Sequence, residues 1–279
     1  MKKTTVDVDS KGFLSQELNE VLKRTALFDS SLRDALPDLL RVGRELSSKC
    51  EVARNQATEE DRKKISVLVL YVRLLDVSES IYVLSSLGAR QETKALFRVF
   101  LDAYFVVARL LSDDTFPQKY FQIDNVERLK LLRVAAKDIP TDFFEPSFKE
   151  LISEEVIAEL DKVIKDERQQ AFNSYSNAIA VGCEHMYNLR YRILGASVHS
   201  GPRAFIDYLD EEESTGIING LSGAITQAEA GRFSFDMGFY LVRVIEGVAQ
   251  LFDLTLPNEY QDMKGVLLKS EPVDDVAGG

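Results

Sequence analysis

Apolar residues recur along most of the chain at intervals of three and four, a spacing typical of amphipathic helices rather than strands. The segments with this pattern are 13–28, 32–52, 58–87, 91–112, 113–137, 153–172, 174–199 and 235–252. Only seven prolines occur in 279 residues, so little interrupts long helices. The pattern predicts an all-α fold, a single helical-bundle domain of about seven or eight helices.

Residues that begin or end helices predict several boundaries. Pro37 suits a first helical turn, so the second helix is expected to begin near Leu36. Thr58, followed by three acidic residues, is a predicted N-cap, and Ser234 is another. Gly88 is expected to end the apolar helix before it, because glycine tolerates the left-handed conformation found there.

The rest of the chain has weaker patterns. Residues 1–10 are a predicted loose N-terminus, residues 11–256 the helical domain and residues 257–279 a flexible C-terminal tail. Residues 203–231 are ambiguous and are expected to form a small irregular insertion. Within it, Glu211–Glu213 is interpreted as a solvated loop.

The segment 91–112 is apolar on nearly every side, which predicts a central helix. Arg98, Asp102 and Arg109 form a narrow polar stripe along it. Burying an unpaired charge costs several kcal/mol. The stripe is therefore expected to pair inside the protein or to line a cavity.

Tyr187–His199 is predicted to form a second central helix with a polar face. Arg192 and His199 are seven residues apart, two helical turns, and so point to nearly the same side. Tyr187, Tyr191, Leu194 and Val198 have the spacing of a buried stripe beside them. His185 is interpreted as an ordinary helix residue.

The net charge of −11 opposes a broad nucleic-acid-binding face, because such binding depends on Lys and Arg displacing counterions. A local basic pocket is still compatible with this charge. Cys50 and Cys183 lack neighbours at metal-ligand spacing, so two buried thiols in a reducing compartment, with no metal and no cofactor, are expected.

The two longest apolar segments, 67–87 and 95–111, contain charged residues that would be costly inside a bilayer. The N-terminus has no apolar core behind its lysines, unlike a signal peptide. We therefore expect a cytoplasmic protein without a membrane partner.

The segment Gly88–Tyr104 resembles the core helix of the domain of unknown function family 5677, with Arg98 and Asp102 at its Arg and acidic positions. A second part of the family pattern is similar to Tyr191, Leu194, Gly195 and Val198-His199, where serine is more usual than Gly195. The resemblance covers roughly residues 65–202.

Arg192 and His199 also resemble the Arg and His of HEPN-type helical proteins, many of which are metal-independent ribonucleases of toxin or phage-defence systems. This implies that His199 acts as general acid or base and Arg192 holds the scissile phosphate, with Tyr191, Arg98 and Asp102 in support. One histidine serves two proton transfers poorly, so a homodimer is expected. Ile193, where polar residues are common, and the long C-terminal segment depart from this pattern.

The same residues also fit a structural interpretation, in which Asp102 pairs with Arg98 and accepts from His199 or Tyr191. Three functions therefore stay open. They are an RNA-cleaving enzyme with its substrate in a local pocket, a binding module or antitoxin-like partner whose acidic surface engages a basic protein, and a nucleotide-sensing domain.

Overall fold

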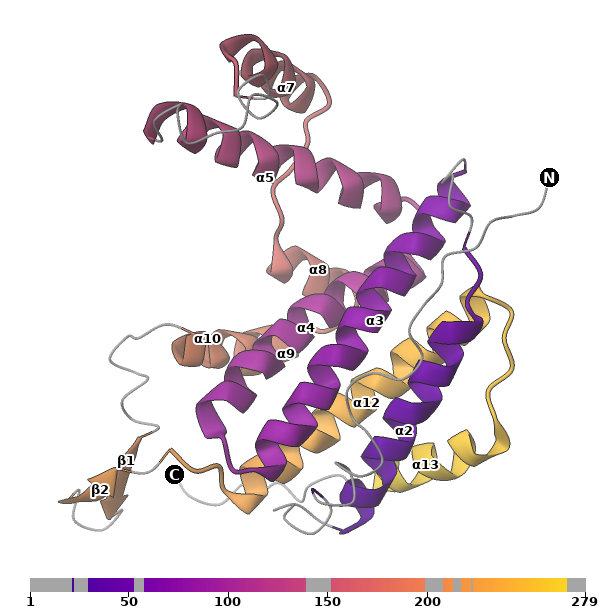
Figure 1. Ribbon diagram of the computed structural model, residues 1–279, viewed down its shortest axis with the longest axis vertical. Helices are drawn as coiled ribbons and strands as arrows, with labels where there is room; N and C mark the ends of the chain where they lie inside the picture. Colours follow the sequence, from indigo (N-terminus) through magenta and orange to yellow (C-terminus); the bar gives the residue numbers. More distant parts are fainter. Residues whose placement is uncertain are drawn as a thin grey trace. The chain divides into compact units, whose positions relative to one another are not determined.

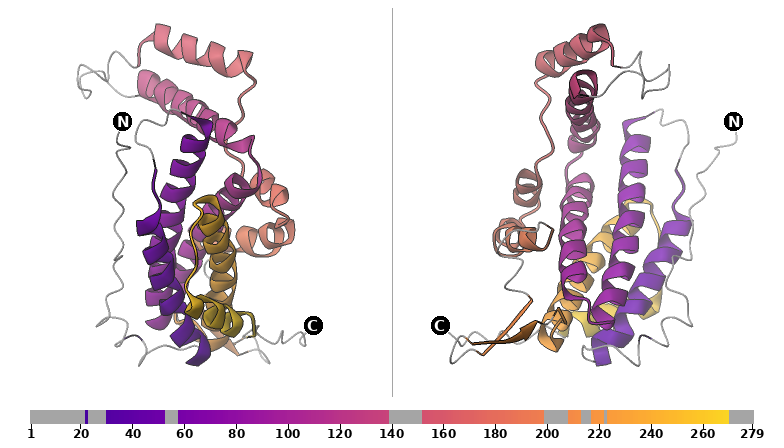
Figure 2. Two further views of the ribbon diagram at one scale, coloured as in Figure 1. Left: turned by 90° about the vertical axis from the view of Figure 1, so that its right-hand side faces the viewer. Right: turned by 60° about the vertical axis from the view of Figure 1, so that its left-hand side comes forward.

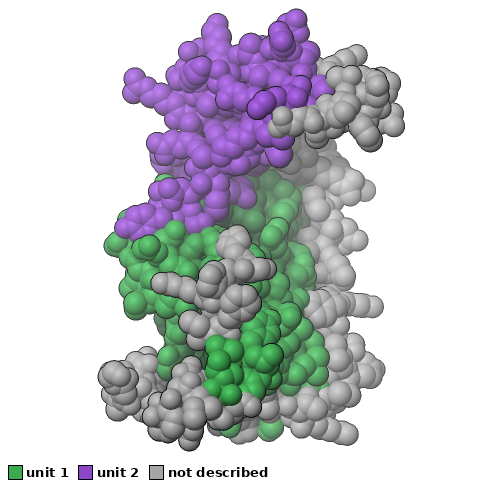
Figure 3. Space-filling view, turned by 90° about the vertical axis from the view of Figure 1, so that its left-hand side faces the viewer, with its two compact units in different colours: residues 1–112, 177–279 green, residues 113–176 purple. Residues whose placement is uncertain are grey.

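The computed structural model describes residue 22 and residues 30–52, 58–138, 152–198, 208–212, 217–221 and 223–269. The chain forms two compact units, coloured in Figure 3: residues 1–112 with 177–279, and residues 113–176. The predicted domain 11–256 thus contains parts of both. Among the described residues the fold is all-α apart from one short hairpin, which confirms the predicted class.

Four helices form the core of the first unit, and Figures 1 and 2 show them side by side. They are α2 (Ser30–Lys49), α3 (Glu59–Ser86), α4 (Arg90–Ser112) and α12 (Gln227–Leu251). Leu22, the one described residue before α2, is helical and buried, while the rest of the predicted helix 13–28 lies outside the described residues. Helix α4 is buried at five consecutive positions from Ala103 to Val107, as expected of a central helix.

The ends of α3 confirm two predictions. Thr58 accepts a hydrogen bond from the Asp61 backbone N–H, and Asp61 accepts one from the Thr58 backbone, a reciprocal capping box. Gly88 has φ +86°. The Ala89 N–H then donates to the Leu84 carbonyl and the Gly88 N–H to the Ser85 carbonyl, so the helix ends in a Schellman turn.

The predicted start of α2 near Leu36 is wrong. The helix begins at Ser30 and continues through Pro37. A proline lacks the N–H that would bond four residues back, which leaves the Arg33 carbonyl without that donor. The Tyr82 hydroxyl of α3 donates to this carbonyl over 3.4 Å, so the neighbouring helix compensates for the proline.

The predicted start of the last long helix at Ser234 is also wrong. Helix α12 begins at Gln227, where Thr226 and Glu229 form a second capping box. Ser234 is fully buried inside the helix. Gly238 also lies inside α12, where an added Cβ would be 2.9 Å from Leu267 Cδ2, so a larger residue would require the Leu267 side chain to shift.

The structure differs from the prediction at the C-terminal end. Part of the expected tail forms helix α13 (Asn258–Lys269), which packs on α2 and α12 through buried Tyr260, Met263 and Leu267. Within the expected irregular insertion, β1 (Leu209–Glu212) pairs antiparallel with β2 (Ile217–Leu221). Glu211 and Glu212 therefore lie in a strand rather than in a loop.

The predicted continuous helix 174–199 is wrong as well. Helix α8 (Ser174–Ala180) ends at Gly182, with φ +71°, in another Schellman turn. Then follow α9 (Glu184–Met186), the π-helical turn η2 (Tyr187–Tyr191) and α10 (Arg192–Val198). Most side chains of this segment are exposed or half-buried, so it is an outer segment rather than a central helix.

The second unit contains α5 (Phe116–Asp138) and α7 (Glu154–Asp166). Leu132 and Ala135 of α5 pack with Ile152 and with Ile157 and Leu160 near and in α7. Helix α7 ends earlier than the predicted Phe172, because Arg168 adopts a left-handed φ of +51°. No described residue of α7 itself is buried, in line with its charged sequence.

None of the helices in the described parts of the chain has the length and apolar character needed to cross a membrane. Cys50 and Cys183 are both free and buried. Burial raises the pKa of the Cys50 thiol to about 12. Both thiols are thus buried, as predicted from the sequence.

Candidate functional site

The polar stripe of α4 meets the outer segment at Tyr191. The Tyr191 hydroxyl donates to Asp102 Oδ2 over 3.1 Å, and Arg98 Nη2 lies 3.4 Å from the same hydroxyl. The Arg98 guanidinium carbon also lies 4.5 Å from the centre of the Tyr191 ring, a cation–π contact. The structure thus brings together three of the five predicted site residues, Arg98, Asp102 and Tyr191, which we call the polar centre.

The π-helical turn positions Tyr191 for these contacts. A π turn bonds residues five apart and contains one residue more than an α turn. Tyr187 and Tyr191 stack within it, with ring centroids 4.8 Å apart. Phe105 of α4 contacts the same ring from 6.3 Å. Tyr191 is therefore held by aromatic packing as well as by hydrogen bonds.

Gly195 allows α10 to approach α4 at the polar centre. A Cβ added at Gly195 would lie 2.8 Å from Arg98 Nη1, closer than real Cβ contacts. The guanidinium occupies the space that a side chain would need. The serine more usual at this position would require Arg98 to move.

The third residue of the stripe, Arg109, does not join the polar centre. Arg109 Nη1 donates to the Asn177 side-chain oxygen of α8 over 2.9 Å. Asn177 is buried, so this bond holds the start of the outer segment against the far end of α4. The stripe therefore serves two separate contacts along one helix.

Of the proposed catalytic pair, Arg192 and His199, the structure describes only Arg192. Arg192 is the first residue of α10, and its side chain is exposed to solvent. His199 lies outside the described residues, so its distance from Arg192 stays a prediction. His185 is exposed on the short helix α9. In the part of the chain that the structure describes, no three His, Cys, Asp and Glu side chains are arranged to hold a metal ion.

A groove of about 360 Å³ opens beside the polar centre, between α4, the outer segment and α12. Lys94, Arg190 and Arg232 contribute three cationic side chains to its lining, against one carboxylate, Glu229. Arg190 Nη2 also lies 3.7 Å from Asp236 of α12, so part of its charge is compensated. Apolar Leu189 and Ile193 also line it and are 63% and 65% exposed. Sequence reasoning missed this groove, because its residues come from three separate segments and each resembles an ordinary surface position.

Glu229 connects the groove to the first turn of α4. It accepts hydrogen bonds from Arg90 Nε and Nη2 over 3.1 and 2.8 Å, and Lys94 Nζ lies 3.5 Å from it. Burial alone would raise the pKa of Glu229, but the bonds from Arg90 and from the Thr226 backbone outweigh it and lower the pKa from 4.5. Glu229 is therefore ionised at neutral pH and neutralises part of the cationic charge in the groove.

A buried ion pair outside the site was also missed. Arg44 of α2 donates to Glu79 of α3 over 2.8 Å, and the two side chains are only 4% and 2% exposed. Asp76 accepts a further bond from Arg44 at the surface. The sequence showed Glu79 as a charge within an apolar run, but nothing in it indicated the partner on another helix.

Comparisons with known proteins identify the family. Residues 64–217 match the family of unknown function DUF5677, while no curated protein and no solved structure matches the chain. The match covers more than half of the 279 residues and includes α4, the polar centre and the outer segment. The resemblance found in the sequence is thus confirmed and extends to residue 217. The chain belongs to the DUF5677 family.

Proposed function

We propose that this protein is a non-catalytic helical binding module. The observation that carries the proposal is the internal pairing of the polar centre. Tyr191 contacts both Arg98 and Asp102, so the groups available for chemistry bond to one another and join α10 to α4. Polar networks satisfied in this way fix the packing of neighbouring helices.

The groove beside the centre is the proposed binding surface. Its three cations, one carboxylate and two exposed apolar side chains fit an acidic segment of a partner protein that also carries leucine-like residues. The charge of the groove lining is positive, opposite in sign to the net charge of the whole chain, which is −11. An acidic partner would be repelled by most of the surface and attracted at the groove, which makes the contact selective.

A synthetic acidic peptide containing leucines tests this function. We expect Lys94→Glu combined with Arg232→Glu to weaken its binding by about tenfold or more, because like charges then face each other. Lys162→Glu on exposed α7 is the matched control and should change little. Fluorescence anisotropy with a labelled peptide measures both. Equal loss in the control, or undiminished binding in the double variant, would refute the groove as the site.

The ribonuclease stays a second candidate, favoured by one observation. Arg192 is exposed, as a residue that holds an RNA phosphate must be. Expression of the wild type and of His199→Ala, followed by growth and total RNA integrity, tests this candidate. RNA cleavage that disappears in a folded His199→Ala protein would replace the binding-module proposal. Intact RNA with the wild type would remove the enzyme.

Tyr191→Phe separates a structural role for the polar centre from a catalytic one. Loss of the hydroxyl removes two contacts, so a structural role predicts a lower free energy of unfolding by about 1 kcal/mol. Thermal and urea unfolding measure this loss. Unchanged stability together with lost RNA cleavage would favour catalysis.

A further inference from the structure

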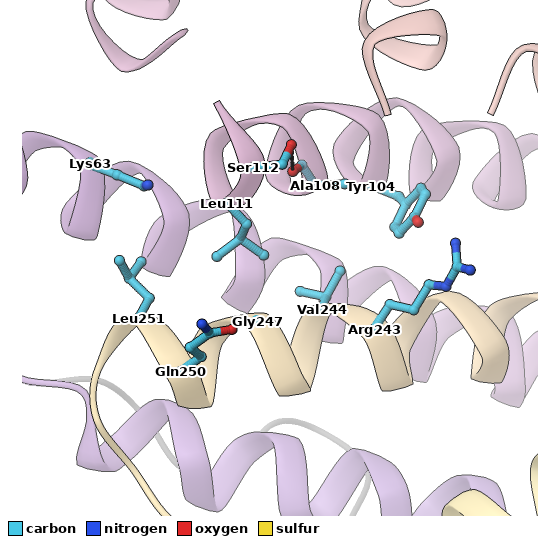
Figure 4. Close-up of a pocket in the computed structure, with 10 residues that line it drawn as sticks. All are labelled: Lys63, Tyr104, Ala108, Leu111, Ser112, Arg243, Val244, Gly247, Gln250 and Leu251. Atoms are coloured by element: carbon cyan, nitrogen blue, oxygen red, sulfur yellow. Dashed lines mark hydrogen bonds between the residues drawn. The ribbon is translucent and has the colours of Figure 1, made fainter. Parts of the chain in front are cut away.

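A second pocket lies away from the polar centre, between the C-terminal halves of α4 and α12 and the first turns of α3 (Figure 4). Its volume is about 460 Å³, within the range of small-molecule sites. All of its lining residues belong to the first unit. Neither the polar centre nor the groove uses any of them.

The charged residues of this pocket have one sign. Lys63 and Arg243 line it, and none of its ten lining residues is Asp or Glu. In a chain with a net charge of −11, a pocket with two cations and no carboxylate is a local inversion of charge. Charge of this kind favours an anionic ligand.

The two cations stand at opposite ends. In Figure 4, Lys63 enters from the α3 side near Leu251, and Arg243 rises at the other end toward Tyr104. Arg243 and Leu251 are eight residues apart on α12, which corresponds to about 12 Å along the helix axis. A ligand that meets both cations must therefore be elongated.

The space between the cations is lined by apolar side chains together with the polar side chains of Ser112 and Gln250. Leu111 and Ala108 come from α4, and Val244 and Leu251 from α12. Gly247 lets the two helices approach here, because an added Cβ would lie 2.7 Å from Leu111 Cδ1. The middle of a ligand in this pocket would contact these apolar side chains as well as Ser112 and Gln250.

We propose that this pocket binds a small organic dianion, an α,ω-dicarboxylate, whose two acidic groups meet Lys63 and Arg243 while its apolar chain lies against Leu111 and Val244. Tyr104 supports the Arg243 end. Burial, with a contribution from Cys183, raises the pKa of Tyr104 to about 12 although Arg243 opposes this, so its hydroxyl stays protonated and able to donate.

Titration calorimetry on the full chain tests the proposal with suberate, with octanoate and with the neutral diol of the same chain length. We expect suberate to bind saturably, octanoate about tenfold more weakly for the loss of one ion pair, and the diol more weakly still. A series from succinate to sebacate should show a maximum in affinity. Equal binding of octanoate and suberate, or no saturable binding by any dicarboxylate, would overturn the proposal.

Two substitutions locate the ligand. Lys63→Gln and Arg243→Gln should each lower the affinity for suberate about tenfold, and each should affect octanoate less, because octanoate needs only one cation. Arg73→Gln removes the same charge from an exposed position of α3 outside the pocket and should leave both affinities unchanged.

Thermal melting establishes that each variant is folded. If Arg243→Gln does not fold, Arg243→Lys keeps the charge and should retain suberate binding. A folded Lys63→Gln protein with wild-type affinity would contradict the two-ended site. This pocket shares no residue with the groove. The result of the peptide-binding experiment with the Lys94 and Arg232 variants is therefore independent of the result for suberate.

Discussion

Helix α4 and the outer segment 174–198 look alike in sequence and differ in the structure. Both have apolar residues at helical spacing together with arginines. Helix α4 is one unbroken element buried at consecutive positions, whereas the outer segment bends at Gly182, passes through a π turn and buries few of its side chains. A helix surrounded by others needs apolar residues on all sides, and a helix that covers a core needs them on one.

The charged residues of the two regions differ in the same way. Arg98 and Asp102 of α4 reach Tyr191, and Arg109 reaches Asn177, so these charges bond inside the first unit. Arg192 of the outer segment points to solvent. The half-buried charges of α4 therefore bond to neutral partners in the outer segment, Tyr191 and Asn177, while Arg190 of that segment lies 3.7 Å from Asp236 of α12.

The largest expected difference concerns truncation of apolar side chains. Phe100 of α4 is fully buried and stacks on Phe97, with ring centroids 5.6 Å apart. Phe100→Ala should lower the free energy of unfolding by about 3–5 kcal/mol through lost burial and a cavity. Ile193→Ala removes an exposed side chain and should change it by less than about 0.5 kcal/mol. Urea unfolding measures both. A similar loss at Ile193 would mean that the groove face is covered in solution.

A matched pair of glycines tests whether the outer segment unfolds with the core. Gly88 and Gly182 have φ of +86° and +71°, end a helix by the same hydrogen-bond pattern, and have nothing within 4 Å of an added Cβ. Alanine at either should cost about 1–2 kcal/mol locally, from strain in the left-handed conformation. We expect the full cost in global unfolding for Gly88→Ala and a smaller one for Gly182→Ala, because an outer segment can open by itself.

Equal losses of global stability would show that the two regions unfold together. Hydrogen exchange of the segment around residues 184–194 provides the independent measurement. Faster exchange there in Gly182→Ala, with the protection of α4 unchanged, is the expected pattern. Uniform loss of protection along both regions would contradict it.

The smallest expected effect depends on pH and concerns the first turn of α4. The pKa of Glu229 is lowered from 4.5 in the folded state, so its ion pairs stabilise the protein above that pH, and this stability is lost as the pH falls through the folded-state pKa. Glu229→Gln should cost about 1 kcal/mol at neutral pH, and the difference from the wild type should vanish in acid.

Glu51→Gln, at an exposed position of the same unit, is the control for a change of charge alone. Urea unfolding at several pH values gives the comparison. A stability difference for Glu229→Gln that persists unchanged in acid would show that packing, rather than ionisation, links Glu229 to Arg90.

Local signals in the sequence were sufficient for part of the fold. Three predicted features depend only on residues close in the sequence, and the structure has all three. They are the cap at Thr58, the turn at Gly88 and the burial of α4 on nearly all sides. The starts of α2 and α12 depend on distant residues. Pro37 is tolerated because the Tyr82 hydroxyl of α3 bonds to the Arg33 carbonyl. Ser234 lies in the core because α12 begins earlier, at Gln227, with Thr226 as its N-cap.

The candidate site likewise has one part that could be predicted from the sequence and one part that could not. A buried stripe of charge on α4 requires a partner, which predicted that Arg98 and Asp102 would meet the Tyr191 segment. The groove and the pocket lined by Lys63 and Arg243 each form where three segments of the chain converge. The spacing of residues within one segment does not indicate such a convergence. All four cations have ordinary spacing for surface residues. Only the packing of the helices brings Lys94 and Arg232 to the groove, and Lys63 and Arg243 to the separate pocket.

The π turn at Tyr187–Tyr191 has a consequence for how the sequence of this segment can change. The turn contains one residue more than an α turn, so one residue can be removed from it without breaking the helix. Deletion of a single residue there, such as exposed Asn188, would convert the turn to regular α-helix. Helix α10 would then begin one residue closer to α9. Changes of length that would disrupt α4 can therefore be absorbed in this segment, at the expense of the position of Tyr191.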